Sequence, residues 1–410
     1  MASETLLESP RPATSEHGAA SRAAPAPVGL MLLISSLEHG GAERQVIELF
    51  KRLDRRRFRP VICSLSRDVP LSRRLNDPHR DLVIVPKRWK YDWSAIRRVA
   101  RVMRARDIRV VHNFLFDAEM VGRCAAKLAR VPVVIASERN TDYTRPWVQN
   151  VCLKLTREWF DDMIANSEAG KQFNIRTLQL PAERIHVVRN GVDVEYFKRT
   201  DALGLRRELD LPADGAVVGM IASFKRQKRH GDFFRTAREI LRQAPDTWFV
   251  CVGEPLRDNQ QGAETYHREM RALVQSLGVL PRFRFPGARH DMPAVYSLCD
   301  VTMLTSEREG TPNVLLESMA CETPVVATDV SDNAHVVSHG EAGFIAPLGD
   351  VATLAMHAVD LLRDRDALRR TGAAARRWVI EQFSTAALAR RTEAVYLDAL
   401  RRKGVGKDDA

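Results

Sequence analysis

The sequence places two carboxylates, Glu309 and Glu317, eight residues apart around the start of a predicted helix. Thr311 suits the N-cap and Pro312 the first helical position, so unpaired backbone N–H groups and the positive end of the helix dipole should face the preceding loop. Glu309 would lie in that loop, and Glu317 about one and a half turns inside the helix at about 3.6 residues per turn. Carboxylates accept hydrogen bonds from vicinal hydroxyls and helix N-termini bind anions, so the segment could hold a sugar or ribose beside a phosphate. Spacing alone leaves a purely structural role open, because any strand–loop–helix connection can carry two glutamates.

Short apolar or β-branched runs alternate with amphipathic helical stretches from residue 28 onward, which is the pattern of parallel β–α units. In the first half we predict strands at 28–37, 59–65, 82–86, 110–112, 133–137, 163–166 and 186–188, with helices at 42–53 and 94–106 among them. In the second half we predict strands at 217–222, 248–253, 283–286, 301–305 and 325–328, with helices at 231–242, 264–277, 293–298 and 312–320. Two further helical stretches, 351–363 and 367–400, end the pattern.

This alternation predicts an α/β protein with two doubly wound, Rossmann-like domains joined by a hinge near 195–213. We expect a disordered tail at 1–27, an N-terminal domain at 28–200 and a C-terminal domain at 201–383. Residues 384–410 would form a helix that packs back on the first domain, followed by a short tail. Ligands of such sheets bind beyond the carboxyl ends of the strands, so the site is expected in the cleft between the domains.

The positive charge of the chain is concentrated in one segment. The 410 residues include 63 Lys and Arg against 52 Asp and Glu, for a net charge of +11, and the 45% apolar content excludes a wholly disordered chain. Residues 51–110 alone hold 19 Lys and Arg against 6 Asp and Glu. Such a segment usually meets the phosphates of nucleic acid, anionic lipid or a phosphorylated substrate, and composition does not choose among these.

The cysteines and the N-terminus predict a cytosolic protein. The six cysteines are scattered without C-x-x-C spacing, so we expect reduced thiols. The N-terminus carries Glu4 and Glu8 where a signal peptide would be basic. The longest uncharged run, 23–37, contains two prolines and is shorter than the roughly 20 apolar residues of a spanning helix. We therefore expect a cytoplasmic location, either free or peripheral on the inner face of the plasma membrane.

The segment around the two glutamates resembles the E-x7-E signature of the retaining nucleotide-sugar glycosyltransferases of family 4, which have the two-domain GT-B fold. The similarity runs from about residue 28 to 390. It includes, in order, His39-Gly40-Gly41-Ala42-Glu43-Arg44, Asn166-Ser167, Asn190-Gly191-Val192-Asp193, Lys228 and Asp332-Asn333-Ala334. Each piece is weak alone, and the ordered set carries the resemblance.

The resemblance implies roles for the site residues. Glu317 would bind the ribose hydroxyls, Glu309 the hydroxyls of the transferred sugar, and Lys228, with Lys225 as helper, the diphosphate. Further donor contacts are implied for Gly40, Gly41, Gly310, Thr311, Asn313 and Val314. The alternatives are a tight turn at Gly40-Gly41, a solvated cation at Lys228 and a structural turn at Asn190-Gly191.

The resemblance implies no cofactor and no metal, the nucleotide-sugar being a co-substrate. The one D-x-D spacing noted, Asp364-Arg365-Asp366, falls in a charge-rich helical stretch rather than in a loop after a strand. Without a metal, protein cations and a helix N-terminus must stabilise the departing diphosphate, and one well-placed donor is typically worth about 3–4 kcal/mol.

The chain departs from the family pattern at several positions. Ser223 stands where an Arg is frequent, Glu322 where a Gly is usual and His335 where a Glu is usual. The common His-x-His after the fourth strand is His112-Asn113-Phe114 here. His112 is our third catalytic candidate, facing the donor sugar, against the alternative of a buried structural histidine.

The expected function is retaining transfer of a sugar, from a UDP-sugar in the favoured case, to a saccharide or lipid-linked saccharide in cell-surface polysaccharide or glycolipid synthesis. A front-face displacement is the family expectation. The alternatives are another GT-B enzyme, such as a sugar-nucleotide epimerase or a phosphorylase, and a nucleic-acid-binding protein. No pyridoxal phosphate lysine context and no nucleic-acid-binding motif is found, so no nucleic-acid partner is expected.

The basic segment suggests a place for the acceptor. The predicted helix 94–106 carries Arg97, Arg98, Arg101 and Arg104 largely away from its apolar stripe, and the stretch 87–93 mixes cations with aromatics. This combination suits a membrane–water interface, so we expect docking on anionic lipid, with a merely solvated helix face as the alternative.

Overall fold

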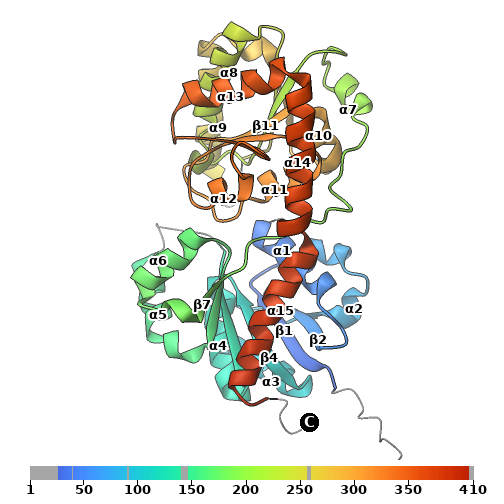
Figure 1. The fold of residues 1–410 in the computed structure, drawn as a ribbon. Coiled ribbons are helices and arrows are strands. Elements are labelled where there is room, and N and C mark those ends of the chain that lie inside the picture. The colour runs from blue at the N-terminus through green and yellow to red at the C-terminus, as the bar shows by residue number, and fades with distance from the viewer. Residues whose placement is uncertain (1–25, 39, 90–91, 140–145, 256–259, 406–410) are drawn as a thin grey trace, which may run out of the picture.

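The computed structural model describes residues 26–38, 40–89, 92–139, 146–255 and 260–405, which form two stacked lobes (Figure 1). Nearly all of the tail predicted at 1–27 lies outside these residues, as do His39 and the end of the C-terminal tail. Each lobe is built on one parallel sheet with helices on both faces. Because both faces are covered, the central strands of each sheet are buried over most of their length, as parallel strands usually are.

The first sheet has seven strands in the order β3-β2-β1-β4-β5-β6-β7. The strands are β1 (Val28–Ile34), β2 (Phe58–Ser64), β3 (Leu82–Ile84), β4 (Ile108–Phe114), β5 (Val133–Glu138), β6 (Asp162–Ala165) and β7 (Ile185–Val187). The helices of this lobe are α1 (Gly41–Arg52), α2 (Pro78–Asp81), α3 (Trp93–Ala105), α4 (Phe116–Ala129), α5 (Trp147–Leu155) and α6 (Glu168–Leu178). Leu30 and Leu32 of β1 share a core with α1, whereas Met31 and Leu33 share one with α3 and α4 on the other face.

The second sheet has six strands in the order β10-β9-β8-β11-β12-β13. The strands are β8 (Val217–Ile221), β9 (Trp248–Val252), β10 (Phe283–Gly287), β11 (Val301–Leu304), β12 (Val325–Thr328) and β13 (Gly343–Ala346). The helices are α7 (Leu203–Glu208), α8 (His230–Gln243), α9 (Gln260–Ser276), α10 (Met292–Leu298), α11 (Asn313–Ala320), α12 (Asn333–Val337), α13 (Val351–Arg363) and α14 (Arg365–Phe383). Residues of α8, α9 and α13 share a core on one face, and residues of α11, α12 and α14 share one on the other.

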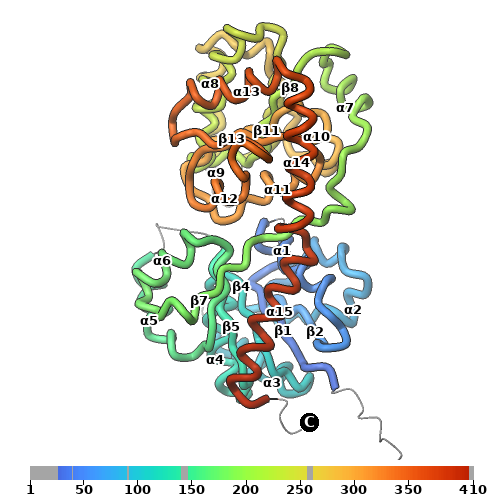
Figure 2. The backbone as a smooth tube through the Cα atoms, in the orientation of Figure 1, coloured from blue at the N-terminus to red at the C-terminus, as the bar shows by residue number. Residues whose placement is uncertain are grey.

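All predicted strands are present, with ends shifted by a few residues, and β13 was not predicted. The helix predicted at 367–400 is two helices, α14 and α15 (Thr385–Arg402), because Ser384 is extended and its hydroxyl caps α15 by accepting from the Ala387 N–H. The long C-terminal helix α15 packs on α1 in the first lobe, as expected (Figures 1 and 2).

The chain passes between the lobes twice, and the two passages are hydrogen-bonded to each other. The N–H of Val192 donates to Phe383 and its carbonyl accepts from Thr385. Figure 2 shows the green and red segments crossing side by side here. The stretch 195–213 predicted as the hinge instead contains α7, which packs against α10 within the second lobe. The crossing therefore lies earlier in the chain than the polar composition suggested.

Candidate active site between the lobes

The helix that carries Glu317 begins one residue later than predicted. Pro312 has an extended conformation and precedes α11, so Asn313 is the first helical residue. Thr311 is not the N-cap, and its hydroxyl instead donates to the carbonyl of Asn166 in the first lobe. This contact holds the N-terminus of α11 against the first lobe.

Glu317 is buried and contacts both lobes. Its Oε1 accepts from Nη1 of Arg44 in α1 at 2.9 Å, and its Oε2 accepts from the hydroxyl of Tyr296 in α10 at 2.8 Å. Burial and the neighbouring carboxylate raise the pKa of Tyr296 well above its usual value, so the phenol stays protonated and donates. The two donors fix the plane of the Glu317 carboxylate.

Glu309 lies in the loop between β11 and α11 and forms an ion pair with Lys228, which lies in the loop after β8. The two loops that carry them are joined: the N–H of Glu307 donates to the carbonyl of Gln227 at 2.9 Å, and the Thr305 hydroxyl donates to the carbonyl of Lys228 at 3.0 Å. Both predicted carboxylates are thus buried and paired with a cation, and Lys228 is not a solvated surface residue.

Close backbone approach explains the glycine before α11. A Cβ on Gly310 would lie 2.6 Å from the side-chain amide atoms of Asn166, which is closer than real contacts allow. Gly41 faces the same place, since its Cβ position lies 3.3 Å from the amide nitrogen of Asn313. At Gly40, the position of a Cβ is occupied by the Glu43 carboxylate. Gly310 and Gly41 thus let the two lobes meet at the N-terminus of α11, whereas the contact at Gly40 lies within the first lobe.

Amide side chains join the lobes around Asn313. Its Oδ1 accepts from Nδ2 of Asn190 at 2.9 Å and from Nε2 of Gln45 at 3.2 Å. Nδ2 of Asn190 also donates to the carbonyl of Thr311 at 2.8 Å. Asn190 is therefore more than a turn residue, and the amide of Asn313 is engaged between the lobes.

Asp332 forms a contact between the lobes that the sequence does not reveal. Its carboxylate accepts from the N–H of Glu168 at 2.9 Å and so caps α6 in the first lobe. It also accepts from Nε of Arg189 at 2.8 Å. A carboxylate at a helix N-terminus is stabilised by the helix dipole as well as by the hydrogen bond.

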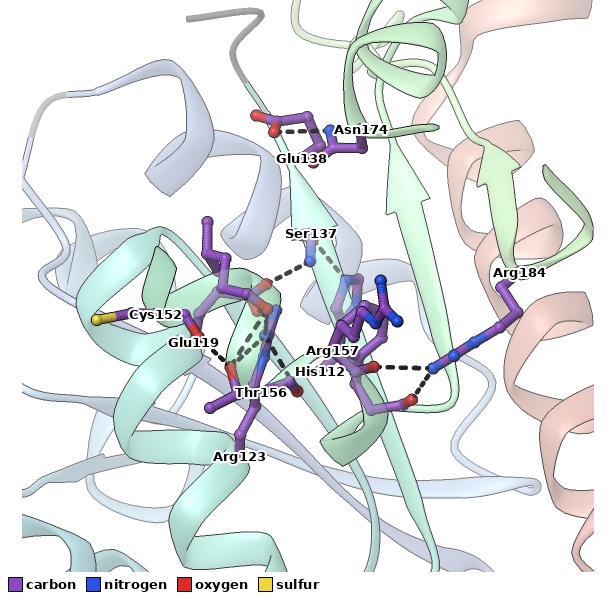
Figure 3. Close-up of polar contacts among 12 residues, drawn as sticks. His112, Glu119, Arg123, Ser137, Glu138, Cys152, Thr156, Arg157, Asn174 and Arg184 are labelled. Atoms are coloured by element: carbon purple, nitrogen blue, oxygen red, sulfur yellow. Dashed lines mark hydrogen bonds and ion pairs between the residues drawn. The ribbon is translucent and has the colours of Figure 1, made fainter. Parts of the chain in front are cut away.

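The structure does not place His112 in the cleft. The side chain is fully buried, with Nδ1 2.6 Å from the hydroxyl of Tyr396 in α15 and Nε2 2.7 Å from the hydroxyl of Ser137. Burial lowers the pKa of His112 well below its usual value, so the ring is neutral. Figure 3 shows it at one end of a buried polar network that continues through Ser137 to Glu119 and Arg123. The expected position facing the donor is wrong, and His112 is a structural histidine.

The remaining candidates lie at the edge of the site. Lys225 is exposed at the start of the 3-10 turn Arg226–Lys228, and Val314 is half-buried against the core under α11. Sequence reasoning missed Arg44 and Tyr296 as partners of Glu317, although Arg44 stands in the quoted motif. It also missed Arg139, whose guanidinium lies 5.0 Å from the ring of Phe114 and whose Nη1 donates to Asn190 at 3.4 Å.

The structure shows the surroundings of three departures from the family pattern. Glu322 follows α11 with a φ of +60°, a left-handed conformation that favours glycine, so the usual Gly there fits the backbone and Glu is strained. Ser223 accepts the N–H of Lys225 with its carbonyl at 2.8 Å. The ring of His335 lies 6.4 Å from that of Phe383, and burial lowers its pKa.

The described residues contain neither a metal-binding cluster nor a membrane-spanning helix. No group of three or more His, Cys, Asp and Glu side chains in this part of the chain is arranged to hold a metal ion. No described helix is long and apolar enough to cross a bilayer.

The basic helix predicted at 94–106 is α3. Arg97, Arg101 and Arg104 are exposed as expected. Arg98 instead turns inward, where it donates to the Asp92 carboxylate at 2.6 Å and to the carbonyl of Pro86. Three arginines, rather than four, are thus presented on its outer face. Lys90 and Tyr91 of the stretch before the helix lie outside the described residues.

Two family models match this chain, one over most of each lobe. A model described as Glycosyltransferase Family 4 matches residues 39–196, and one described as Glycosyl transferases group 1 matches residues 204–378. Together they span most of the chain.

Curated relatives are 26–29% identical to this chain over the stretches that align. N-acetyl-alpha-D-glucosaminyl L-malate synthase of Bacillus anthracis is 29% identical over 55% of this chain and 57% of its own, so little more than half of that relative is matched. D-inositol 3-phosphate glycosyltransferase of Thermobispora bispora is 27% identical over 72% of this chain and 71% of its own. The UDP-Gal:alpha-D-GlcNAc-diphosphoundecaprenol alpha-1,3-galactosyltransferase of Escherichia coli is 26% identical over 79% and 84%.

Solved structures show the same fold. Anabaena HepE in complex with UDP has a TM-score of 0.79 at 22% identity, over 90% of this chain and all of its own. Sucrose-phosphate synthase of Thermosynechococcus elongatus has a TM-score of 0.73 at 20% identity, over 92% and 100%. The two facing parallel sheets are thus the GT-B fold. With both lobes matched by family models and the fold shared, the chain belongs to the family 4 glycosyltransferases of GT-B type.

Proposed function

We propose that this glycosyltransferase moves a sugar, with retention of anomeric configuration, from a UDP-sugar to a hydroxyl of a saccharide or lipid-linked saccharide in cell-surface polysaccharide or glycolipid synthesis. The observation that carries the proposal is that the Glu309–Lys228 ion pair lies in the loop before α11 and Glu317 lies in α11 itself, where the helix contacts the first lobe. These are hydroxyl acceptors and a cation beside a helix end that favours anions.

The donor fits this arrangement in two parts. Glu317 keeps acceptor positions free after Arg44 and Tyr296 have bound, and vicinal ribose hydroxyls would use them. Lys228, with Lys225 near it in the chain, would meet the diphosphate together with the N-terminus of α11. Glu309 would exchange part of its contact with Lys228 for hydroxyls of the transferred sugar.

The transfer step breaks the bond between the anomeric carbon and the diphosphate oxygen and forms one to the acceptor oxygen. In a front-face displacement the acceptor attacks from the side of the leaving group, and its proton passes to the departing diphosphate. Lys228 and the helix N-terminus would stabilise the growing negative charge, a role in which one donor is typically worth about 3–4 kcal/mol. In this proposal the step uses no metal ion.

The choice of a UDP-sugar and of a lipid-linked acceptor rests on similar proteins. The Escherichia coli relative is named for a UDP-Gal donor and a diphosphoundecaprenol acceptor. HepE structures hold UDP and UDP-glucose. A lipid-linked acceptor would place the enzyme at the inner face of the plasma membrane.

Thermal unfolding in the presence of UDP-, GDP- and ADP-sugars tests the donor, because a ligand of the native state raises the midpoint. We expect a shift with UDP-sugars only, followed by transfer to a saccharide acceptor that is unaffected by EDTA. Proton NMR of the product then reports the anomeric configuration. Transfer with inversion, loss of activity in EDTA, or no shift with any UDP-sugar would contradict the corresponding part of the proposal.

A further inference from the structure

The helix α5 exposes its apolar side chains. Trp147 is 75% exposed, Val148 51%, Val151 43% and Leu155 76%. Leu153 is the one buried residue of the helix, so most of its apolar surface faces outward. A contiguous exposed apolar surface of this kind usually marks an interaction site.

A buried arginine, together with the packing of Leu153 in the core, holds α5 in place. Arg123 of α4 is fully buried, pairs with Glu119 and donates from Nη1 to the Thr156 hydroxyl at 2.9 Å. The same nitrogen lies 3.5 Å from the carbonyl of Leu153, and the guanidinium lies 4.4 Å from the ring of Phe160. Figure 3 shows this network at the end of α5. Arg123 thus contacts the C-terminal end of α5 from the buried side, so the exposed side chains of α5 are not needed to anchor the helix.

The surroundings of this face are mainly basic and aromatic, and the exposed Glu158 just after α5 is paired with Arg157 and Arg184. The nine residues of α5 include Lys154 and no acidic residue. Directly after it, Trp159 is partly exposed, and the ammonium of Lys127 from α4 lies 4.5 Å from its ring. Close to Lys127 in the sequence, Leu128 near the end of α4 and Arg130 just after it are also exposed. Tryptophan with lysine and arginine around an apolar face is the composition of helices that lie in a membrane interface.

The basic helix α3 belongs to the same layer. Apolar residues of α3, α4 and α5 share one core on one face of the first sheet. The exposed Arg97, Arg101 and Arg104 of α3 lie in this layer, and Nη2 of Arg104 donates to the carbonyl of Leu128 in α4. Trp93, which is also exposed, begins α3 as Trp147 begins α5. In parallel β–α units helices start at the carboxyl edge of the sheet, so both tryptophans lie toward the cleft.

We propose that the exposed face of α5 inserts into the interface of an anionic bilayer while the α3 arginines contact lipid phosphates. The purpose of this docking, access to a lipid-linked acceptor, rests on the proposed function. Charge decides for lipid over a second copy of the chain, because pairing two such layers would bring the arginines of both copies together. The expectation from sequence named only the basic segment, and the structure adds the apolar half of the surface from a different part of the chain.

Vesicle flotation with the full chain tests the proposal. We expect recovery with vesicles of phosphatidylcholine and phosphatidylglycerol in equal parts, and little with phosphatidylcholine alone. The double variant Val151→Glu/Leu155→Glu should lose about tenfold or more in binding to the anionic vesicles, because it places charges on the inserted face. The matched control is Leu203→Glu, since Leu203 is an exposed apolar residue of α7 in the second lobe and should leave binding unchanged.

A second readout follows Trp147 itself. Its emission should shift to the blue on anionic vesicles and be quenched by brominated lipid, and Trp147→Phe should remove most of that signal. The thermal shift by UDP-sugar should be the same in the double variant and the wild type, which shows that α5 is not needed for donor binding or folding.

The docking proposal is overturned if wild type and double variant float equally, if neither floats, or if the variant splits a dimer that does not bind vesicles. These outcomes are independent of the donor. A protein that floats as expected but transfers no sugar would contradict the proposed function and leave the membrane surface standing.

Discussion

Nη1 of Arg44 in the first lobe lies 2.9 Å from Oε1 of Glu317 in the second, although the two residues are 273 positions apart. Tyr296 holds the other oxygen of the same carboxylate. A carboxylate has about four lone-pair positions, so about two remain in a fixed orientation after both donors have bound. The ion pair therefore joins the lobes and, with Tyr296, fixes the orientation of the Glu317 carboxylate.

Arg44→Ala should raise the KM for the nucleotide-sugar by about tenfold and change kcat much less, because binding rather than the transfer step loses its support. Arg44→Lys should recover part of the loss, since a lysine restores charge without the fixed geometry of a guanidinium. Initial rates over a range of donor concentrations measure both constants. Arg56→Ala is the control, because Arg56 pairs with Asp54 on the surface. An unchanged donor KM in Arg44→Ala would contradict the orienting role.

Breaking the ion pair between Glu309 and Lys228 should lower kcat rather than raise KM. Glu309→Gln and Lys228→Met should each lower kcat by about 10²–10³, the range for one lost electrostatic contact to a transition state. Because the two groups act together, the double variant should lose much less than the product of the single effects. Single-turnover measurements separate this step from product release.

Matched controls for this pair stand two residues away in each loop. Glu307→Gln and Arg226→Gln remove partly exposed charges that pair with Arg308 and Glu269 respectively. Both should keep near-normal kcat. Near-normal turnover in Glu309→Gln or Lys228→Met would exclude that residue from the catalytic machinery.

The sequence predicts the two sheets, apart from β13, and the two-lobe fold because most strands and amphipathic helices have a local signature. The site is only half predictable. Glu309, Lys228 and Glu317 belong to sequence motifs that each lie within one lobe. The contacts of Arg44 and Asp332 instead depend on how the two lobes meet, which no local sequence pattern encodes. Tyr296 was missed for a related reason, since its partner is on another helix.

The wrong predictions have physical causes. Pro312 favours the first turn of a helix but also suits the extended position before it. The Thr311 hydroxyl donates to the carbonyl of Asn166 and so does not cap α11. His112 ends the predicted strand 110–112, where a ligand-binding residue could lie, but β4 runs on to Phe114, and α15 returns from the far end of the chain and covers His112 with Tyr396. The exposed face of α5 escaped notice because exposure, unlike periodicity, is decided by what packs nearby.

Asp332→Ala should favour separation of the lobes. The variant removes the acceptor of the Glu168 N–H and the partner of Arg189 together, while Ser167 still caps α6, and a hydrogen bond to a charged group is typically worth about 1.5–3 kcal/mol. We expect a larger radius of gyration by small-angle scattering in the absence of donor and a higher donor KM. Asp329→Ala is the control, since Asp329 is exposed three residues earlier. An unchanged radius of gyration and an unchanged KM would show that Asp332 does not hold the lobes together.

Buried neutral histidines predict that the protein loses stability in acid. Burial lowers the pKa of His230 to about 3, and its ring lies 4.2 Å from that of Phe224, with the two stacked. The unfolded chain binds a proton below an ordinary pKa of about 6.5, whereas the native state does not until about 3. Stability therefore falls as the pH drops through this window, by at most about 1.4 kcal/mol per pH unit for one histidine.

His230→Phe keeps an aromatic ring against Phe224 and removes the titration. Urea unfolding at about pH 7.5, 5.5 and 4.5 should show a shallower loss of stability in this variant than in the wild type, by about 1.4 kcal/mol per pH unit at the acid end. His290→Gln, at an exposed position, should follow the wild type. His112 contributes in the same direction, so some acid sensitivity should remain in His230→Phe. Parallel pH dependences in wild type and His230→Phe would mean that His230 is not held neutral by its surroundings.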